Sequence, residues 1–512
     1  MNASWRLRLV GRSVRVAAAA TAAWLAISAI APLPATGHAL GGVFTLPVPL
    51  ALYLAGAGAV VAASFVVAVV VVRPGGRIPH YPTRPILPET ARRGSLLLRW
   101  LGMVWWFGAI AIGLVISQVS PAPAVLFWIL IWVGLPIVTV LLGNPWPSLS
   151  PFRALFGLLE RVSRWAGFDR LDLGLRYPAV LGRWPAVVLL FVTVWCELVL
   201  PDRVAPHTVA VLMGGYTVVT LIGIFLFGRV GWLRNAELFE VYLGWFGRVG
   251  PVGRRVVQPD ACAGCAEECD PEHCVDCPEC TAVATSGEQR PELRPWFTGL
   301  SEVSHAGWSD AGFIVLALAA VTYDGLSETS VWAAIMKPFA GALAGLLGST
   351  GSVLAAETLG LLALWLAFLG AFSMATRLTG AMHDPEIEPR PLGTTVGAYA
   401  ATLLPIAGGY LIAHYLTLLI QGIAWLPGLI VDPVTSVAPP LNWMPISAVW
   451  YLSVGAIVLG HVAAVVLAHR LALREAAIRP ILAGLPLVVL MIGYTVLSLW
   501  IIAQPIALEP GS

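Results

Sequence analysis

Residues Cys262 to Cys280 read CAGCAEECDPEHCVDCPEC, a stretch of nineteen residues that holds six of the seven cysteines in the chain. The cysteines follow the spacing C-x2-C-x3-C-x4-C-x2-C-x2-C. Each C-x2-C pair can bind one metal ion through two thiolates on a single turn of the chain. The apolar residues between them are alanines and one valine, too few to close a hydrophobic core. The segment is therefore either a metal module folded by its ion or an unstructured loop.

Zinc is the metal that the two outer pairs of cysteines favour. An eleven-residue connection separates these pairs, and four thiolates complete a closed structural zinc site. The expected ligands are Cys262, Cys265, Cys277 and Cys280. An iron–sulfur cluster is the alternative, because Cys274 and the two cysteines after it also read C-x2-C-x2-C. Cys269, Cys274 and His273 remain for a second ion or for exchange with the first set.

The rest of the chain has the composition of a polytopic membrane protein. Hydrophobic residues make up 58% and charged residues 11%, with a mean hydropathy of +0.82. A net charge of +2 indicates no basic surface for nucleic acid. We expect an all-α protein with about ten transmembrane helices in contact with the lipid bilayer. The expected spans cover residues 47–72, 97–118, 124–142, 184–200, 207–227, 308–323, 353–376, 395–423, 445–469 and 481–504.

The N-terminal segment has the organisation of a secretory signal. Four arginines between Arg6 and Arg15 precede an apolar run over residues 16–31, and Ala35-Thr36-Gly37 supplies small residues for cleavage. An uncleaved first span is the alternative. Cleavage after Gly37 makes His38 the mature N-terminus, where the terminal amine and the imidazole suit Cu(II).

The arginines fall in alternate loops, which predicts the orientation of the spans. Residues on both sides of the cysteine segment, including Arg248, Arg254 and Arg290, place it in the cytoplasm of a bacterial cell, with both mature termini outside the plasma membrane. Reducing conditions there favour metal thiolates over disulfides. We expect four parts: residues 1–37, a membrane half at 38–228, a loop at 229–305 and a second membrane half at 306–512. Two halves of five spans have opposite orientations, as in inverted-repeat transporters.

Ionisable residues in the expected spans are candidates for function, because they are costly inside a membrane. Glu197, Asp324 and Glu357 lie near the outer ends of three spans, and His414 lies about 13 Å deep in a fourth. His414 shares a helix face with Tyr410. We expect an outward-facing polar pocket formed by these four candidates, the alternative being carboxylates that are simply hydrated. His461 is expected to be a buried, hydrogen-bonded histidine, and His469 an interfacial one.

Three shorter segments are expected to lie at the membrane surface or to enter it partway. Ser150-Pro151 predicts the start of an amphipathic helix on the inner leaflet, with Phe152 and Phe156 on its apolar face. Asn235 is expected to cap a second interfacial helix. Residues 332–347 are apolar but short, which favours a re-entrant or interfacial helix over a span.

Six short stretches, in this order, carry a resemblance to a known group of proteins. They are His38-Ala39-Leu40-Gly41 with Leu46-Pro47-Val48-Pro49, Gly143-Asn144-Pro145-Trp146, Pro151-Phe152-Arg153, Tyr323-Asp324-Gly325, Tyr410 to Tyr415, and Gly460-His461-Val462. The chain thereby resembles multipass actinobacterial membrane proteins that are commonly labelled fenitrothion hydrolase. The resemblance implies phosphotriester hydrolysis and assigns no catalytic residue.

Two classes of function therefore stay open. In a membrane-embedded hydrolase, Glu197, Asp324, Glu357 and His414 hold a metal or act as acid and base on an apolar phosphotriester. In a secondary transporter, the same carboxylates carry protons or a cation at the interface of the two halves. The distances between these side chains are what distinguishes a site from separate hydrated groups.

Overall fold

The computed structural model describes residues 50–71, 83–86, 88–116, 119–256, 289–301, 303, 306–382, 391–441, 443–474 and 480–503. The signal segment and the six clustered cysteines lie outside the described residues. The chain forms two compact units, which are described separately below. Unit 1 contains residues up to Pro79 together with Ser304–Thr417 and Asn442–Ser512, and unit 2 contains His80–Val303 with Leu418–Leu441.

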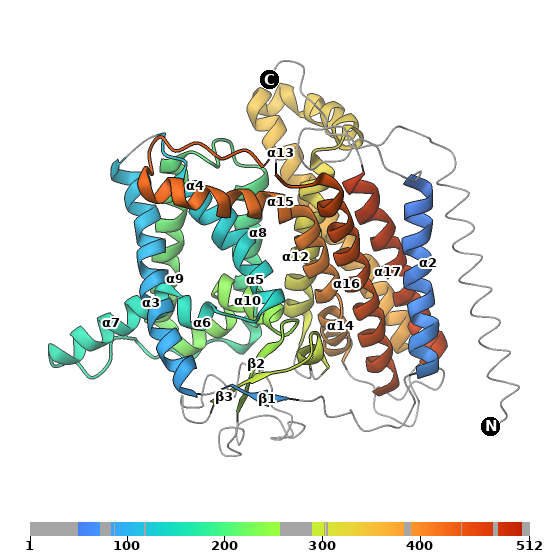
Figure 1. Ribbon diagram of the computed structural model, residues 1–512, viewed down its shortest axis with the longest axis horizontal. Helices are drawn as coiled ribbons and strands as arrows, with labels where there is room; N and C mark the ends of the chain where they lie inside the picture. The colour runs from blue at the N-terminus through green and yellow to red at the C-terminus, as the bar shows by residue number, and fades with distance from the viewer. Residues whose placement is uncertain are drawn as a thin grey trace, which may run out of the picture. The chain divides into compact units, whose positions relative to one another are not determined.

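Unit 1 is a bundle of apolar helices. Its elements are α2 (Leu50–Val71), α12 (Trp308–Ser327), α13 (Ser330–Gly380), α14 (Leu392–Ala401), the first part of α15 (Leu404–Val431), α16 (Ile446–Arg474) and α17 (Pro480–Ile502). Helix α2 packs against α16 and α17, although some 400 residues separate them in the chain (Figure 1). The compact unit thus joins the first mature span to the second half of the sequence, across the boundary expected at the cysteine segment.

Two glycines bend long helices in places that match the expected segments. Helix α13 is interrupted at Gly348, whose φ of 72° suits glycine better than any other residue. The arm before this break corresponds to the segment at 332–347, and the arm after it contains the expected span at 353–376. Helix α9 (Pro206–Asn235) breaks in the same way at Gly228, with φ 74°, directly after the expected span at 207–227.

Unit 2 combines membrane-length helices with shorter amphipathic and buried ones. Its helices are α3 (Pro88–Ala111), η1 (Ile112–Ile116), α4 (Ala122–Ala124), η2 (Val125–Gly134), α5 (Leu135–Leu141), α6 (Trp146–Leu149), α7 (Pro151–Trp165), η3 (Ala179–Leu181), α8 (Trp184–Leu198), α9, α10 (Leu238–Gly247) and η6 (Thr298–Leu300). The segments η1 and η2 are π-helical. The apolar helical segment from Ala122 to Leu141 therefore changes from α-helix to π-helix at Val125 and back to α-helix at Leu135.

The described residues contain eight helices that are long and apolar enough to cross a membrane. Two shorter apolar helices, Leu54–Val70 and Trp184–Leu198, coincide with two further expected spans. The expected helical, multi-pass architecture is confirmed at this level. One expected span differs in detail, because residues 395–423 are divided between α14 and α15, and α15 continues to Val431.

A small antiparallel sheet in unit 2 was not expected from the sequence. Its order is β1 (Arg84–Pro85), β3 (Gln289–Leu293), β2 (Val252–Val256). Strands β2 and β3 pair from Val252↔Leu293 to Val256↔Gln289, so the cysteine-containing segment connects two neighbouring strands at one end of their ladder. An ion pair between Arg255 and Glu292, at 2.9 Å, links the same two strands.

The two expected surface helices of unit 2 have different outcomes. Helix α7 begins as predicted, because the Ser150 side chain accepts a hydrogen bond from the backbone N–H of Arg153, and Phe152 and Phe156 are buried. The second prediction is wrong in two respects. Asn235 does not cap α10 but donates to the carbonyl of Gly231, and α10 is buried on almost every side.

Glu237 is the residue that caps α10, and it lies in the aromatic core of unit 2 with no exposed surface. Its carboxylate accepts hydrogen bonds from the backbone N–H groups of Phe239 and Glu240 at 3.2 and 2.7 Å. It also accepts from the Tyr216 hydroxyl and, at 3.2 Å, from the indole of Trp146. One carboxylate thus satisfies four donors from three segments, as a buried charge requires.

Glu237→Ala is therefore expected to destabilise unit 2. The substitution leaves the helix end and two buried side-chain donors without an acceptor, a loss of about 2–4 kcal/mol. Thermal unfolding of the purified protein measures it. Glu160→Ala is the matched control, because Glu160 makes only a 3.7 Å ion pair with half-exposed Arg229 and should change stability little. Equal stability of the two variants would show that the Glu237 bonds contribute nothing.

Candidate functional site

A histidine and an aspartate from two helices of unit 1 form a close pair. Nε2 of His414, on α15, lies 2.9 Å from Oδ2 of Asp324, near the end of α12. The hydroxyl of Tyr415 donates to the same oxygen at 2.6 Å. The side chains of His414 and Asp324 are 15% and 18% exposed, so the pair is largely enclosed but still accessible. Oδ2 of Asp324 is thus shared by the Tyr415 hydroxyl and the His414 ring.

Local sequence explains why α12 and α15 approach one another here. Gly325 follows Asp324, and a Cβ at this position would lie 2.7 Å from Cγ2 of Ile501, 3.2 Å from the hydroxyl of Tyr410 and 3.4 Å from Cε1 of His414. A side chain there would displace Ile501 and press on Tyr410, because those two contacts are tighter than ordinary van der Waals packing. The glycine in Tyr323-Asp324-Gly325 therefore lets the α15 side chains reach the face of α12.

A second carboxylate, Glu357, lies beside the neighbouring residue of α12. It accepts hydrogen bonds from the Tyr323 hydroxyl and, at 3.2 Å, from the indole of Trp332. The tight turn between α12 and α13 brings Trp332 back onto Tyr323, because the Thr329 side chain caps α13 by accepting from the Trp332 N–H at 3.1 Å. Two consecutive residues of α12 are thus associated with a carboxylate. Tyr323 is hydrogen-bonded to the carboxylate of Glu357, and Asp324 has a carboxylate of its own.

Tyr410 adds a buried polar group that the surrounding protein leaves unsatisfied. Its side chain has no exposed surface, and among the described residues its hydroxyl finds no hydrogen-bond partner. Its ring lies 6.0 Å from the ring of His414. A buried hydroxyl normally bonds to protein or to an ordered water, and Tyr410 shares the lack of a partner in the described part of the protein with the Tyr494 hydroxyl of the same unit.

Of the four candidate residues, unit 1 contains three and brings two into direct contact. Asp324 pairs with His414, whereas Glu357 bonds to Tyr323, the residue before Asp324. Glu197 lies on α8 in unit 2, near enough to Tyr242 for its charge to act on that side chain. Tyr415, Tyr323 and Trp332 are the residues that sequence reasoning missed, although all three lie within the stretches or turns next to the candidates.

The other histidines of unit 1 are structural in character. His461 is fully buried and bonds through Nδ1 to the carbonyl of Ile457 at 2.8 Å, as expected. His469 is also buried, with its ring edge-to-face against Phe65 at 5.7 Å, and so differs from the interfacial residue that was expected.

The described residues contain no evident metal-binding site. No group of three or more His, Cys, Asp or Glu side chains in these parts of the chain lies close enough to hold one ion. The cysteine set Cys262, Cys265, Cys269, Cys274, Cys277 and Cys280 lies outside them. Comparisons of the chain with protein-family models, curated proteins and solved structures gave no match. The chemistry of the site therefore has to carry the functional argument.

Two tyrosine substitutions test this geometry. Tyr415→Phe removes a donor from a largely buried carboxylate and is expected to cost about 1–3 kcal/mol of stability. Tyr410→Phe removes a hydroxyl that has no partner in the protein, so stability should stay the same or rise. Thermal unfolding of both variants in one detergent compares them. A matching loss in Tyr410→Phe would contradict the assignment of Tyr410 as unsatisfied.

Proposed function

We propose that this chain is a plasma-membrane protein in which the Asp324–His414 pair takes up and releases a proton, coupled to movement of an ion or small molecule. The 2.9 Å contact between the two side chains, inside two candidate membrane helices, carries the proposal. Ionisable residues at such positions are costly, and paired ones commonly mark proton or ion pathways. Histidine is the side chain whose charge changes most readily near neutral pH.

The hydrogen bonds suggest how the pair exchanges its proton. Tyr415 donates to Asp324 and holds the carboxylate in its ionised form, so Nε2 of His414 carries a hydrogen that points at Asp324. The second ring nitrogen, Nδ1, is then the one that accepts the exchanging proton. The charge that appears on the ring is offset by the adjacent carboxylate. Tyr410, beside this ring, is placed to hold a water or another small polar ligand.

The arginine distribution assigns a direction to this exchange. It places the end of α12 with Asp324 at the outer face, the loop at 229–305 in the cytoplasm and both mature termini outside. Protons then reach the pair from the extracytoplasmic side. An uptake route from that side fits the partial exposure of Asp324 and His414.

A hydrolase is the second candidate, and a specific observation favours it. An imidazole fixed by a carboxylate through one nitrogen is oriented to act through the other as a general base on water. Two of the stretches that resemble the fenitrothion hydrolase group, Tyr323-Asp324-Gly325 and Tyr410 to Tyr415, meet at this pair. In this role His414 activates water for attack on an apolar phosphotriester, and Asp324 positions the ring.

Proton binding at His414 is expected to be visible without knowledge of the substrate. A pH-difference infrared spectrum of wild-type protein in liposomes should contain imidazole and carboxylate bands that disappear in His414→Gln. His461→Gln is the matched control, because His461 is a buried histidine of the same unit that bonds only to a backbone carbonyl. Its spectrum should retain those bands. Bands that survive in His414→Gln would overturn the proposal.

The same variants separate the two candidate functions. Turnover of a 4-nitrophenyl phosphotriester, followed by release of 4-nitrophenolate, should fall by about 100-fold or more in His414→Gln if His414 is a general base. Absence of turnover in wild-type protein that shows the infrared bands supports proton coupling over hydrolysis.

The cysteine segment is proposed to hold zinc through Cys262, Cys265, Cys277 and Cys280, with an iron–sulfur cluster as the alternative. The described strands support a compact module, because the pairing of Val256 with Gln289 fixes both ends of the segment side by side. We propose a structural or sensing role for it in the cytoplasm.

Elemental analysis and an absorption spectrum of anaerobically purified protein test the metal. About one zinc per chain without visible absorbance is the expected result, because a closed four-thiolate site takes a single ion. Replacing Cys262 and Cys265 by serine should release it, whereas serine at Cys196, a buried cysteine on α8, should not. Iron with labile sulfide would replace zinc by a cluster, and metal-free folded protein would refute both.

A further inference from the structure

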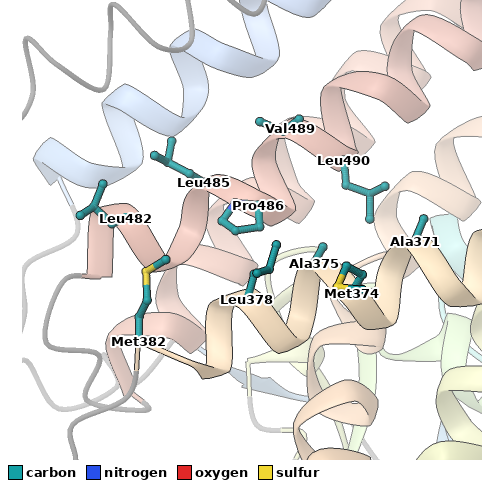
Figure 2. Close-up of a pocket in the computed structure, with 10 residues that line it drawn as sticks. All are labelled: Ala371, Met374, Ala375, Leu378, Met382, Leu482, Leu485, Pro486, Val489 and Leu490. Carbon is teal, nitrogen blue, oxygen red and sulfur yellow. The ribbon is translucent and has the colours of Figure 1, made fainter.

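An apolar groove runs between α13 and α17 in unit 1 (Figure 2). It has a volume of about 510 Å³ and is lined along its length by hydrophobic side chains. Ala371 and Leu378 of α13, together with Met382 just beyond its end, face Leu482, Pro486 and Leu490 of α17. None of the ten lining residues is polar, so the groove offers no hydrogen bond to a ligand.

The groove opens toward the surroundings of the protein. Met374, Leu378 and Val489 line it and are 57%, 49% and 52% exposed. Both of its helices are candidate membrane spans, Ser330–Gly380 and Ile481–Ile501. An exposed apolar channel at such a position faces hydrocarbon, and only an apolar occupant fills it without loss of hydrogen bonds.

The length of the groove approaches the depth of one leaflet of a bilayer. Its lining on α17 extends from Leu482 to Leu490, which is about 12 Å at 1.5 Å per residue. Half of a hydrocarbon core is about 15 Å thick. An acyl chain that enters from one membrane surface can therefore lie along the whole groove.

A cation lies beside the groove at the end where a headgroup would be. Arg377 is exposed in the last turn of α13 and directly precedes the lining residue Leu378. A long arginine side chain can extend toward the membrane surface, and its guanidinium binds phosphate through two parallel hydrogen bonds. Anionic lipids are concentrated in the cytoplasmic leaflet, the side on which the arginine distribution places this helix end.

We propose that the α13–α17 groove is a binding site for an anionic phospholipid, with one acyl chain in the groove and the phosphate at Arg377. The proposal rests on the membrane assignment of α13 and α17 and is independent of the proton-exchange site. Two interactions contribute to lipid binding. The groove binds an acyl chain of any lipid, and Arg377 selects lipids with an anionic headgroup.

Native mass spectrometry of the full chain, released from nanodiscs of equal phosphatidylglycerol and phosphatidylcholine, tests this site. Wild-type protein is expected to retain one phosphatidylglycerol in clear preference to phosphatidylcholine. Ala371→Trp fills the groove and should reduce retention of both lipids about tenfold. Arg377→Gln should abolish the preference while a lipid is still retained.

Matched controls guard against general effects of size and charge. Leu366→Trp changes an exposed apolar residue of α13 outside the groove, and Arg161→Gln removes an exposed arginine of α7 in unit 2. Both should behave as wild type. If Ala371→Trp does not fold, Met374→Trp fills the same groove from a position that is 57% exposed. Equal retention of the two lipids by wild-type protein would overturn the proposal, and so would loss of lipid in Leu366→Trp. A wild-type dimer that dissociates in Ala371→Trp would also overturn it, because a second copy of the chain would then occupy the groove.

Discussion

A polar group placed among apolar helices must find its hydrogen-bond partners inside the protein, because hydrocarbon supplies none. Three carboxylates show how this chain meets the requirement. Glu237 collects four donors, Glu357 collects a phenol and an indole, and Asp324 collects a phenol and an imidazole. In each case at least one donor comes from a helix other than the one that carries the carboxylate or that it caps. These bonds therefore fix which helices are neighbours and at what rotation, a choice that non-directional apolar contacts leave open.

The three carboxylates differ in their exposure and in the kind of hydrogen-bond partner that each of them has. Glu237 is enclosed, and two of its donors are the N–H groups of the helix it caps, which is the arrangement of a structural residue. Asp324 and His414 are partly exposed, and a partner of Asp324 is itself titratable. The Tyr410 ring lies 6.0 Å from the ring of His414 in the same unit. The chemistry proposed above therefore involves the Asp324 site, and Glu237 is expected to contribute to stability.

Sequence reasoning was most successful where one local property decides the outcome. Hydropathy and length located the spans, and Ser150-Pro151 gave the start of α7, because capping depends on a few adjacent residues. It did not identify the sheet, since five-residue strands separated by a long segment carry little periodic signal. It predicted Asn235 as a cap because asparagine is a preferred cap residue, while the burial that favours Glu237 depends on distant Trp146 and Tyr216. The contact of Asp324 with His414 likewise depends on tertiary packing, which one sequence does not reveal.

The β2–β3 ladder has a consequence for how the chain can vary. Paired residues of an antiparallel ladder have Cα atoms about 5 Å apart, so Val256 and Gln289 meet at a distance that a two-residue turn also spans. The entropy of closing the longer connection grows only with the logarithm of its length, so extra residues between fixed ends cost little. The fold around the ladder is thus nearly indifferent to what is inserted there. Connections of different length between Val256 and Gln289 are therefore compatible with the same register of β2 and β3.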